Sequence, residues 1–134
     1  MQRSAMAKIA VRAPDDPNAA DQLAYLNLLL NEDVDKNFAI AKKLADQYPN
    51  RLAYRVSIAL GYLRQHDAAS ALAQFKAPAP IDWKRTLPGW RAVYAAALLA
   101  SDHNEEARDI IGSIPRDQLN PQEQELIEEQ REAR

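Results

Sequence analysis

Two histidines are the first candidates for metal chemistry. His66 and His103 stand at nearly equivalent turn positions between successive predicted helices, which would place them about one structural repeat apart on the same edge. Protein zinc sites use three or four side-chain ligands, and no third ligand accompanies this pair. We therefore interpret both histidines as solvated turn residues and predict no metal site.

Carboxylates gather near the C-terminus, where they could bind a cation or act as an acid and base. Acid–base catalysis requires a concave, partly dry pocket that shifts a carboxyl pKa. A polar terminal helix is not expected to supply one, so we interpret the cluster as a solvated face. The cluster comprises Glu123, Glu125, Glu128, Glu129 and Glu132.

Nucleophilic catalysis lacks its components in this sequence. The chain has no cysteine, and Ser57, Ser70 and Ser101 have no base in a pattern that fits activation. No glycine-rich loop between a strand and a helix is present to hold phosphate. The sequence therefore predicts a protein that is not an enzyme and that has no catalytic residues and no cofactor.

Composition further limits the class of partner. The 134 residues carry a formal charge of −2 without a basic cluster, which argues against nucleic acid. The longest apolar run, Ala92 to Ala100, is far shorter than the roughly 20 residues that span a bilayer, so we expect no membrane insertion. The first residues do not resemble a secretory signal. A cytoplasmic location is the default, to be set by the parent N-terminus if the chain is a fragment.

Prolines and capping residues predict a succession of helices, and scarce glycine argues against hairpins. Asn104 is expected to cap one helix with Glu105 and Glu106 in its first turn. The segment Asn120-Pro121-Gln122-Glu123 predicts another helix start. The expected helices cover residues 17–31, 33–48, 50–65, 68–76, 88–101, 104–114 and 120–134.

These helices repeat along the chain. Residues 63–75 align with residues 99–111 at an offset of 36, which superposes Ala71 on Ala107. An offset of 34 relates the first unit to the second and places Tyr25 under Ala59. In this register Asn37 occupies the position of the small alanine in the other units.

The repeat resembles the tetratricopeptide repeat family, whose unit of about 34 residues has large apolar positions on its first helix and a small alanine on its second. Residues 51–78 are most similar, with Ala59 and Ala71 at small positions and Tyr62 and Phe75 at aromatic ones. Arginine replaces the tryptophan frequent in the family, at positions 55 and 91. The sequence of these helices as a whole is similar to C-terminal regions of large bacterial proteins of this family.

The resemblance implies an all-α fold, in which antiparallel helix pairs stack as a short right-handed α-solenoid of about three units with a C-terminal capping helix. The units are 17–50, 51–80 and 87–115, with a proline-rich connection at 77–88 and the polar cap at 116–134. Residues 1–15 resemble the trailing helix of a preceding, truncated repeat, so we expect a fragment of a longer protein; a simple N-terminal cap is the alternative.

The family's concave groove would be lined by the first helices of the pairs. Residues carried over to it are mostly apolar, and Arg64 and Gln22 alone do not make the carboxylate clamp that some family members use. Exposing so many leucines would rival the stability of a domain, so something should cover them. The predicted groove residues are Gln22, Leu26, Leu30, Val56, Leu60, Leu63, Arg64 and Leu99.

Two occupants of this groove are open. An amphipathic helix of a partner protein would make the chain a scaffold or interaction module. Alternatively, tight curvature, the proline-rich connection or the C-terminal helix fills the groove, and Trp83 anchors that connection. Other functions are a structural spacer, a self-associating end that forms a weak homodimer, the docking site of the upstream parent chain, or the non-catalytic tail of a larger enzyme.

Overall fold

The computed structural model describes residues 16–76 and 81–132. All secondary-structure elements in this part of the chain are helices, so the all-α prediction is confirmed there. The expected trailing helix at 1–15 lies outside the described residues, as do Pro78 and Pro80. The α-helices are α2 (Pro17–Leu29), α3 (Val34–Gln47), α4 (Leu52–Arg64), α5 (Ala68–Ala73), α6 (Pro88–Ala100), α7 (Asn104–Gly112) and α8 (Pro121–Glu132), with short 3-10 helices η1 (Trp83–Arg85) and η2 (Arg116–Gln118).

Helix starts follow the capping chemistry at both ends of the described chain. The Asp16 carboxylate accepts a hydrogen bond from the Asn18 amide at 2.9 Å in front of Pro17. At α8, the Asn120 side chain accepts from the Glu123 amide at 2.7 Å, and the Glu123 carboxylate accepts from the Asn120 amide at 3.0 Å. This reciprocal pair is the capping box that the sequence predicts.

The start of α7 differs from the prediction by one residue. Asn104 is the first helical residue, and His103 is the N-cap, without a side-chain hydrogen bond to the helix. Glu105 and Glu106 do lie in the first turn, as predicted. The negative charges of this turn, which face the positive end of the helix dipole, replace the missing cap.

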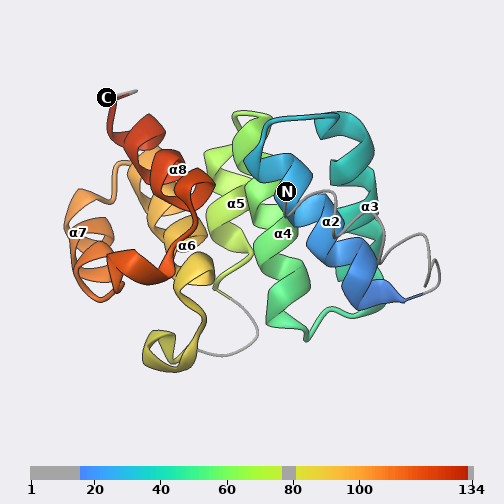
Figure 1. The fold of residues 1–134 in the computed structure, drawn as a ribbon, viewed down its shortest axis with the longest axis horizontal. Coiled ribbons are helices and arrows are strands. Elements are labelled where there is room, and N and C mark those ends of the chain that lie inside the picture. Colours follow the sequence, from blue (N-terminus) through green and yellow to red (C-terminus); the bar gives the residue numbers. More distant parts are fainter. Residues whose placement is uncertain (1–15, 77–80, 133–134) are drawn as a thin grey trace.

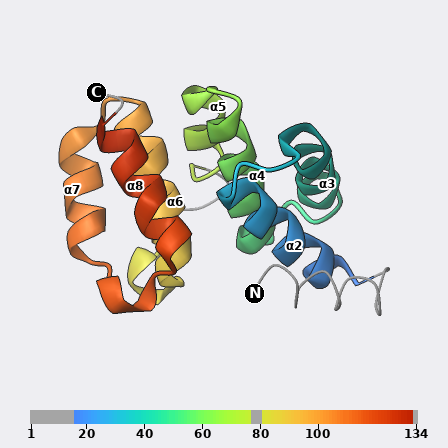
Figure 2. The same ribbon diagram turned by 45° about the horizontal axis from the view of Figure 1, so that its top comes forward.

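The helices pack as successive pairs. The first helix of each pair contacts the second, in the pairs α2–α3, α4–α5 and α6–α7. The first helices also contact each other in order along the chain, α2 with α4 and α4 with α6. Figures 1 and 2 show α4 and α5 between the α2–α3 pair and the group formed by α6, α7 and α8. The last helix lies along α6 and also contacts α2, so the end of the described chain meets its beginning.

Three first helices end in the same way. Asn31, His66 and Asp102 follow α2, α4 and α6 with φ near +60°, the left-handed conformation of a helix C-terminus. In each case the next amide donates to a carbonyl five residues earlier, for example Asp67 to Tyr62 at 2.9 Å and His103 to Leu98 at 2.8 Å. This shared ending is a structural marker of the repeat.

The marker corrects the register of the first unit by one residue. Asn31 and His66 are 35 residues apart, whereas the predicted offset is 34. The corrected offset superposes Ala24, Ala59 and Ala95, and each of these side chains is 0% exposed. A small residue is therefore required at this level of all three first helices, and Tyr25 is free to point elsewhere.

The difference in register comes from a longer turn in the first unit. Asn37, at the position of the small alanine, is 3% exposed and donates to the carbonyls of Glu32 and Asp33 at 3.3 and 3.0 Å. Its Oδ1 accepts from Asn27 at 3.4 Å. The amide side chain thus adds hydrogen bonds to backbone carbonyls of the added turn, which an alanine would not provide.

The connection before α6 is held by an aromatic cluster. Trp83 in η1 stacks on Tyr94, with ring centroids 4.1 Å apart and planes 4° apart, and its centroid lies 5.6 Å from that of Phe75. These contacts attach η1 to α6 and to Phe75, two residues after the end of α5. Trp83 therefore serves as an intramolecular anchor, which is one of the alternatives that the sequence analysis left open.

Candidate functional site

Half of the predicted groove belongs to the core. Val56 and Leu60 are 0% exposed, and Leu63 and Leu99 are also buried. The first three lie on α4, which packs against α2 and α6, and Leu99 lies on α6, which packs against α4 and α8. In this structure a partner cannot reach these four side chains, because the packing of the protein's own helices buries them.

The other predicted groove residues lie nearer the surface, in two separate places. Gln22 is exposed and Leu26 is half-buried, and both line a pocket described below. Leu30, at the far end of α2, is 36% exposed and does not line that pocket. Arg64 is engaged within the protein.

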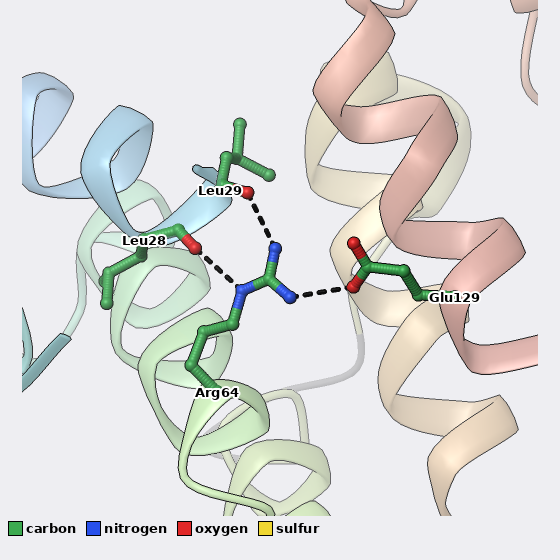
Figure 3. Close-up of polar contacts among 4 residues, drawn as sticks. All are labelled: Leu28, Leu29, Arg64 and Glu129. Carbon is green, nitrogen blue, oxygen red and sulfur yellow. Dashed lines mark hydrogen bonds and ion pairs between the residues drawn. The ribbon is translucent and has the colours of Figure 1, made fainter. Parts of the chain in front are cut away.

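Arg64 joins three helices (Figure 3). Its Nε donates to the Leu28 carbonyl and its Nη2 to the Leu29 carbonyl, each at 2.7 Å, while its Nη1 pairs with Glu129 of α8 at 2.8 Å. The side chain is only 9% exposed. Arg64 therefore satisfies the last carbonyls of α2 and attaches α8 to them, which leaves none of its charge for a partner.

A half-open pocket of about 600 Å³ lies at the opposite end of the α2–α8 contact. It is bounded by the first turns of α2, by α4, by the start of α6, and by η2 and α8. Its volume is within the range of small-ligand sites. The lining residues are Asp21, Gln22, Tyr25, Leu26, Ala53, Ser57, Leu87, Pro88, Gly89, Trp90, Gln118 and Glu123.

Asp21 is the unusual group in this pocket. It is 7% exposed, and its Oδ1 has no hydrogen-bond partner. Burial raises the pKa of the Asp21 carboxyl to about 7, against a smaller opposing effect of the Ser57 hydroxyl. A buried acceptor without a donor costs stability, so this residue is a functional-site candidate.

Glu123 is also buried, but its carboxylate is fully engaged. Besides the capping box, it accepts a hydrogen bond from the Tyr25 hydroxyl at 2.6 Å. Burial, followed by the charge of Glu123, raises the Tyr25 pKa well above its usual value, so Tyr25 remains a neutral donor. A Cβ on Gly89 would lie 2.9 Å from the Glu123 carboxyl carbon, which shows why the start of α6 needs glycine there.

The acidic cluster therefore differs from a uniformly solvated face. Glu123 is buried at the pocket and Glu129 pairs with Arg64, whereas Glu125, Glu128 and Glu132 are exposed. The prediction that the terminal helix borders no pocket is wrong. Burial was hidden in the sequence because one helix face of α8 packs on α6 through Leu126 and Ile127, and Glu123 precedes them on that face.

The structure also shows the surroundings of the two histidines and of Ser57. His66 is exposed at its turn, and His103 lies 3.7 Å from Glu106 of the same helix. No group of three potential metal ligands occurs among residues 16–76 and 81–132. Ser57 donates to the Ala53 carbonyl at 3.3 Å, which is a common arrangement within a helix.

Sequence reasoning missed Asp21 and Tyr25. The signal for Asp21 was present, since an acidic residue stands among the small and apolar residues of α2 three positions before Ala24 and seven before Leu28. An acid on the buried stripe of a helix is uncommon and marks a site to inspect. Tyr25 was assigned to the wrong face by the one-residue error in register.

The chain has no match among family models, curated proteins or solved structures. In the part of the chain that the structure describes, no helix is both long and apolar enough to cross a membrane.

Proposed function

We propose that the chain is a non-catalytic interaction module of the tetratricopeptide type, which binds a segment of another protein at the pocket between α2, α6, η2 and α8. The observation that supports this most is Leu87, which is 58% exposed at the pocket. Leu26, Pro88 and Trp90 extend the apolar lining from it. Apolar side chains around a few buried polar groups are typical of binding sites.

The lining favours binding over catalysis. Its titratable groups are Asp21, Tyr25 and Glu123, and two of these three are bonded to each other. Tyr25 keeps its proton at neutral pH, and the Ser57 hydroxyl donates to the Ala53 carbonyl. The pocket thus offers mainly hydrogen-bond acceptors and apolar contact, which suit binding.

Peptide display against the whole chain tests this function. A library is selected on the native protein and counter-selected on the Leu26→Asp variant, which places a charge in the pocket lining. Leu30→Asp is the matched control, because Leu30 is the C-cap residue of the same helix and lies outside the pocket. We expect selected peptides to bind the native chain and the control, and to bind Leu26→Asp at least tenfold more weakly.

Two results would overturn the proposal. One is a selection that enriches no peptide, and the other is a set of peptides that bind Leu26→Asp and the native chain equally. Circular dichroism of both variants confirms that they remain folded.

Self-association is the second candidate, because the exposed Leu87 could contact a second copy of the chain. Light scattering over a hundredfold range of concentration tests it, and a dimer lost in Leu87→Ser would support it. A monomer at every concentration would exclude this candidate and leave the partner segment.

A further inference from the structure

The pocket holds two acidic side chains without a compensating cation. Asp21 and Glu123 are both 7% exposed, and no lysine, arginine or histidine is among the lining residues. Asp21 and Tyr25 are one helical turn apart on α2, and Tyr25 bonds to Glu123, so the two acids share the pocket through this tyrosine. Charge complementarity therefore favours a positively charged occupant.

One buried side-chain acceptor of the pocket, Asp21 Oδ1, has no hydrogen-bond partner among the described residues. The Glu123 oxygens accept from Tyr25 and Asn120, whereas Asp21 Oδ1 accepts from nothing. Buried acceptors in native proteins are nearly always satisfied, and an exception calls for a ligand or another specific cause. A donor from outside the chain would supply the missing hydrogen bond and would also neutralise the carboxylate.

The shape and lining distinguish between a guanidinium and an ammonium group. Apolar side chains and the half-buried Trp90 border the acids. A guanidinium is planar, less strongly hydrated than an ammonium, and stacks on aromatic rings. The protein already uses this chemistry at the other end of the α2–α8 contact, where the guanidinium of Arg64 binds two carbonyls and Glu129.

We propose that the pocket receives an arginine side chain of the partner protein, with its guanidinium donating to Asp21 and its methylenes lying against Leu26, Leu87 and Trp90. This inference rests on the proposed function and specifies the chemistry of the segment that binds. Asp21 is the recognition residue, and Glu123 contributes charge while it remains bonded to Tyr25. The unfavourable burial of Asp21 in the free protein is relieved when the cation arrives.

Phenylguanidinium and phenylurea form a matched pair of probes, since they have similar shape and differ in charge. Each is titrated into the full chain at pH 8 and followed by amide chemical shifts in NMR spectra. We expect phenylguanidinium to shift signals of Asp21, Gln22, Gly89 and Glu123 saturably, and phenylurea to bind at least tenfold more weakly. Equal affinity for the two probes, or shifts confined to other residues, would overturn the inference.

Variants assign the effect to one carboxylate. Asp21→Asn keeps the size of the side chain and should weaken phenylguanidinium binding about tenfold, whereas Asp109→Asn on the exposed face of α7 should leave it unchanged. If phenylguanidinium binds Asp21→Asn and the native protein equally well, Asp21 does not recognise the ligand. Failure of phenylguanidinium while displayed peptides still bind through Leu26 would overturn the arginine inference alone; failure of both would overturn the proposed function as well.

Discussion

The two ends of the contact between α2 and α8 treat their charges in opposite ways. At one end Arg64 is surrounded by three acceptors, and its bonds close the space between the helices. At the other end Asp21 is buried with an unbonded oxygen beside a pocket of about 600 Å³. The contact between α2 and α8 therefore has one end that stabilises the fold and one end that destabilises it. We expect binding at the second end.

The largest effect is expected from Arg64→Met. The variant keeps the apolar stem but leaves the Leu28 and Leu29 carbonyls without their donor, and it frees Glu129. We expect a loss of about 3 kcal/mol in the free energy of unfolding, measured with urea. Arg131→Met, which removes the exposed pair with Glu128, is the control and should cost less than about 1 kcal/mol. Similar losses in both variants would contradict the special role of Arg64.

Asp21→Asn should change the free energy of unfolding in the opposite direction, towards greater stability. The folded-state pKa of about 7 exceeds the ordinary value of 3.8, so the folded protein holds a proton that the unfolded chain releases. Stability from this group is full below about pH 4 and is lost as the pH rises through 7. The full shift corresponds to roughly 4 kcal/mol at 1.36 kcal/mol per pKa unit, an upper limit.

We therefore expect Asp21→Asn to stabilise the protein by about 2 kcal/mol at pH 8 relative to its effect at pH 4. Urea unfolding at both pH values measures this difference. If the free energies of unfolding of the native protein and of the variant change in parallel with pH, Asp21 is not the titrating group.

Gly89→Ala should destabilise the pocket end of the α2–α8 contact without affecting the end that contains Arg64. The added methyl group meets the Glu123 carboxylate and lies 3.2 Å from the Tyr25 hydroxyl, so the bond between them must move. We expect a loss of about 1 to 2 kcal/mol. Gly112→Ala is the matched control, because no atom lies within 4 Å of its new methyl group, and it should be neutral or stabilising. Thermal unfolding of the two variants provides the comparison.

The smallest effect is expected from Glu129→Gln. The Glu129 side chain is 41% exposed, and Arg64 retains both carbonyl bonds in this variant. A loss below about 1 kcal/mol is predicted from urea unfolding. A loss as large as that of Arg64→Met would mean that the ion pair, rather than the carbonyls of α2, makes the closed end stable.

Local chemistry made much of the helical fold predictable. Proline and capping residues define the starts of α2 and α8, and the alignment of the second and third units relies on Ala71 and Ala107, which are both 0% exposed. The first unit was harder, because its longer turn is stabilised by Asn37 rather than by apolar contacts. A polar residue at a buried position gives no periodic signal.

The candidate site was less accessible to sequence analysis. Its acids come from α2 and α8, and the bond between Tyr25 and Glu123 joins residues 98 positions apart. Periodicity shows which face of a helix is buried, but it does not show which distant helix covers that face. Of the predicted groove leucines, Leu60, Leu63 and Leu99 are buried whereas Leu30 is exposed, and periodicity did not separate the two groups.

The return of α8 to α2 has a consequence for how the protein unfolds. In a linear repeat array each unit contacts only its neighbours, so the ends can unfold separately. Here contacts spanning 98 and 65 residues link the last helix to α2 and to α4. Amide protons of α2 and α8 should therefore exchange with solvent as one cooperative unit, and a partner that engages the pocket would slow exchange in both helices together.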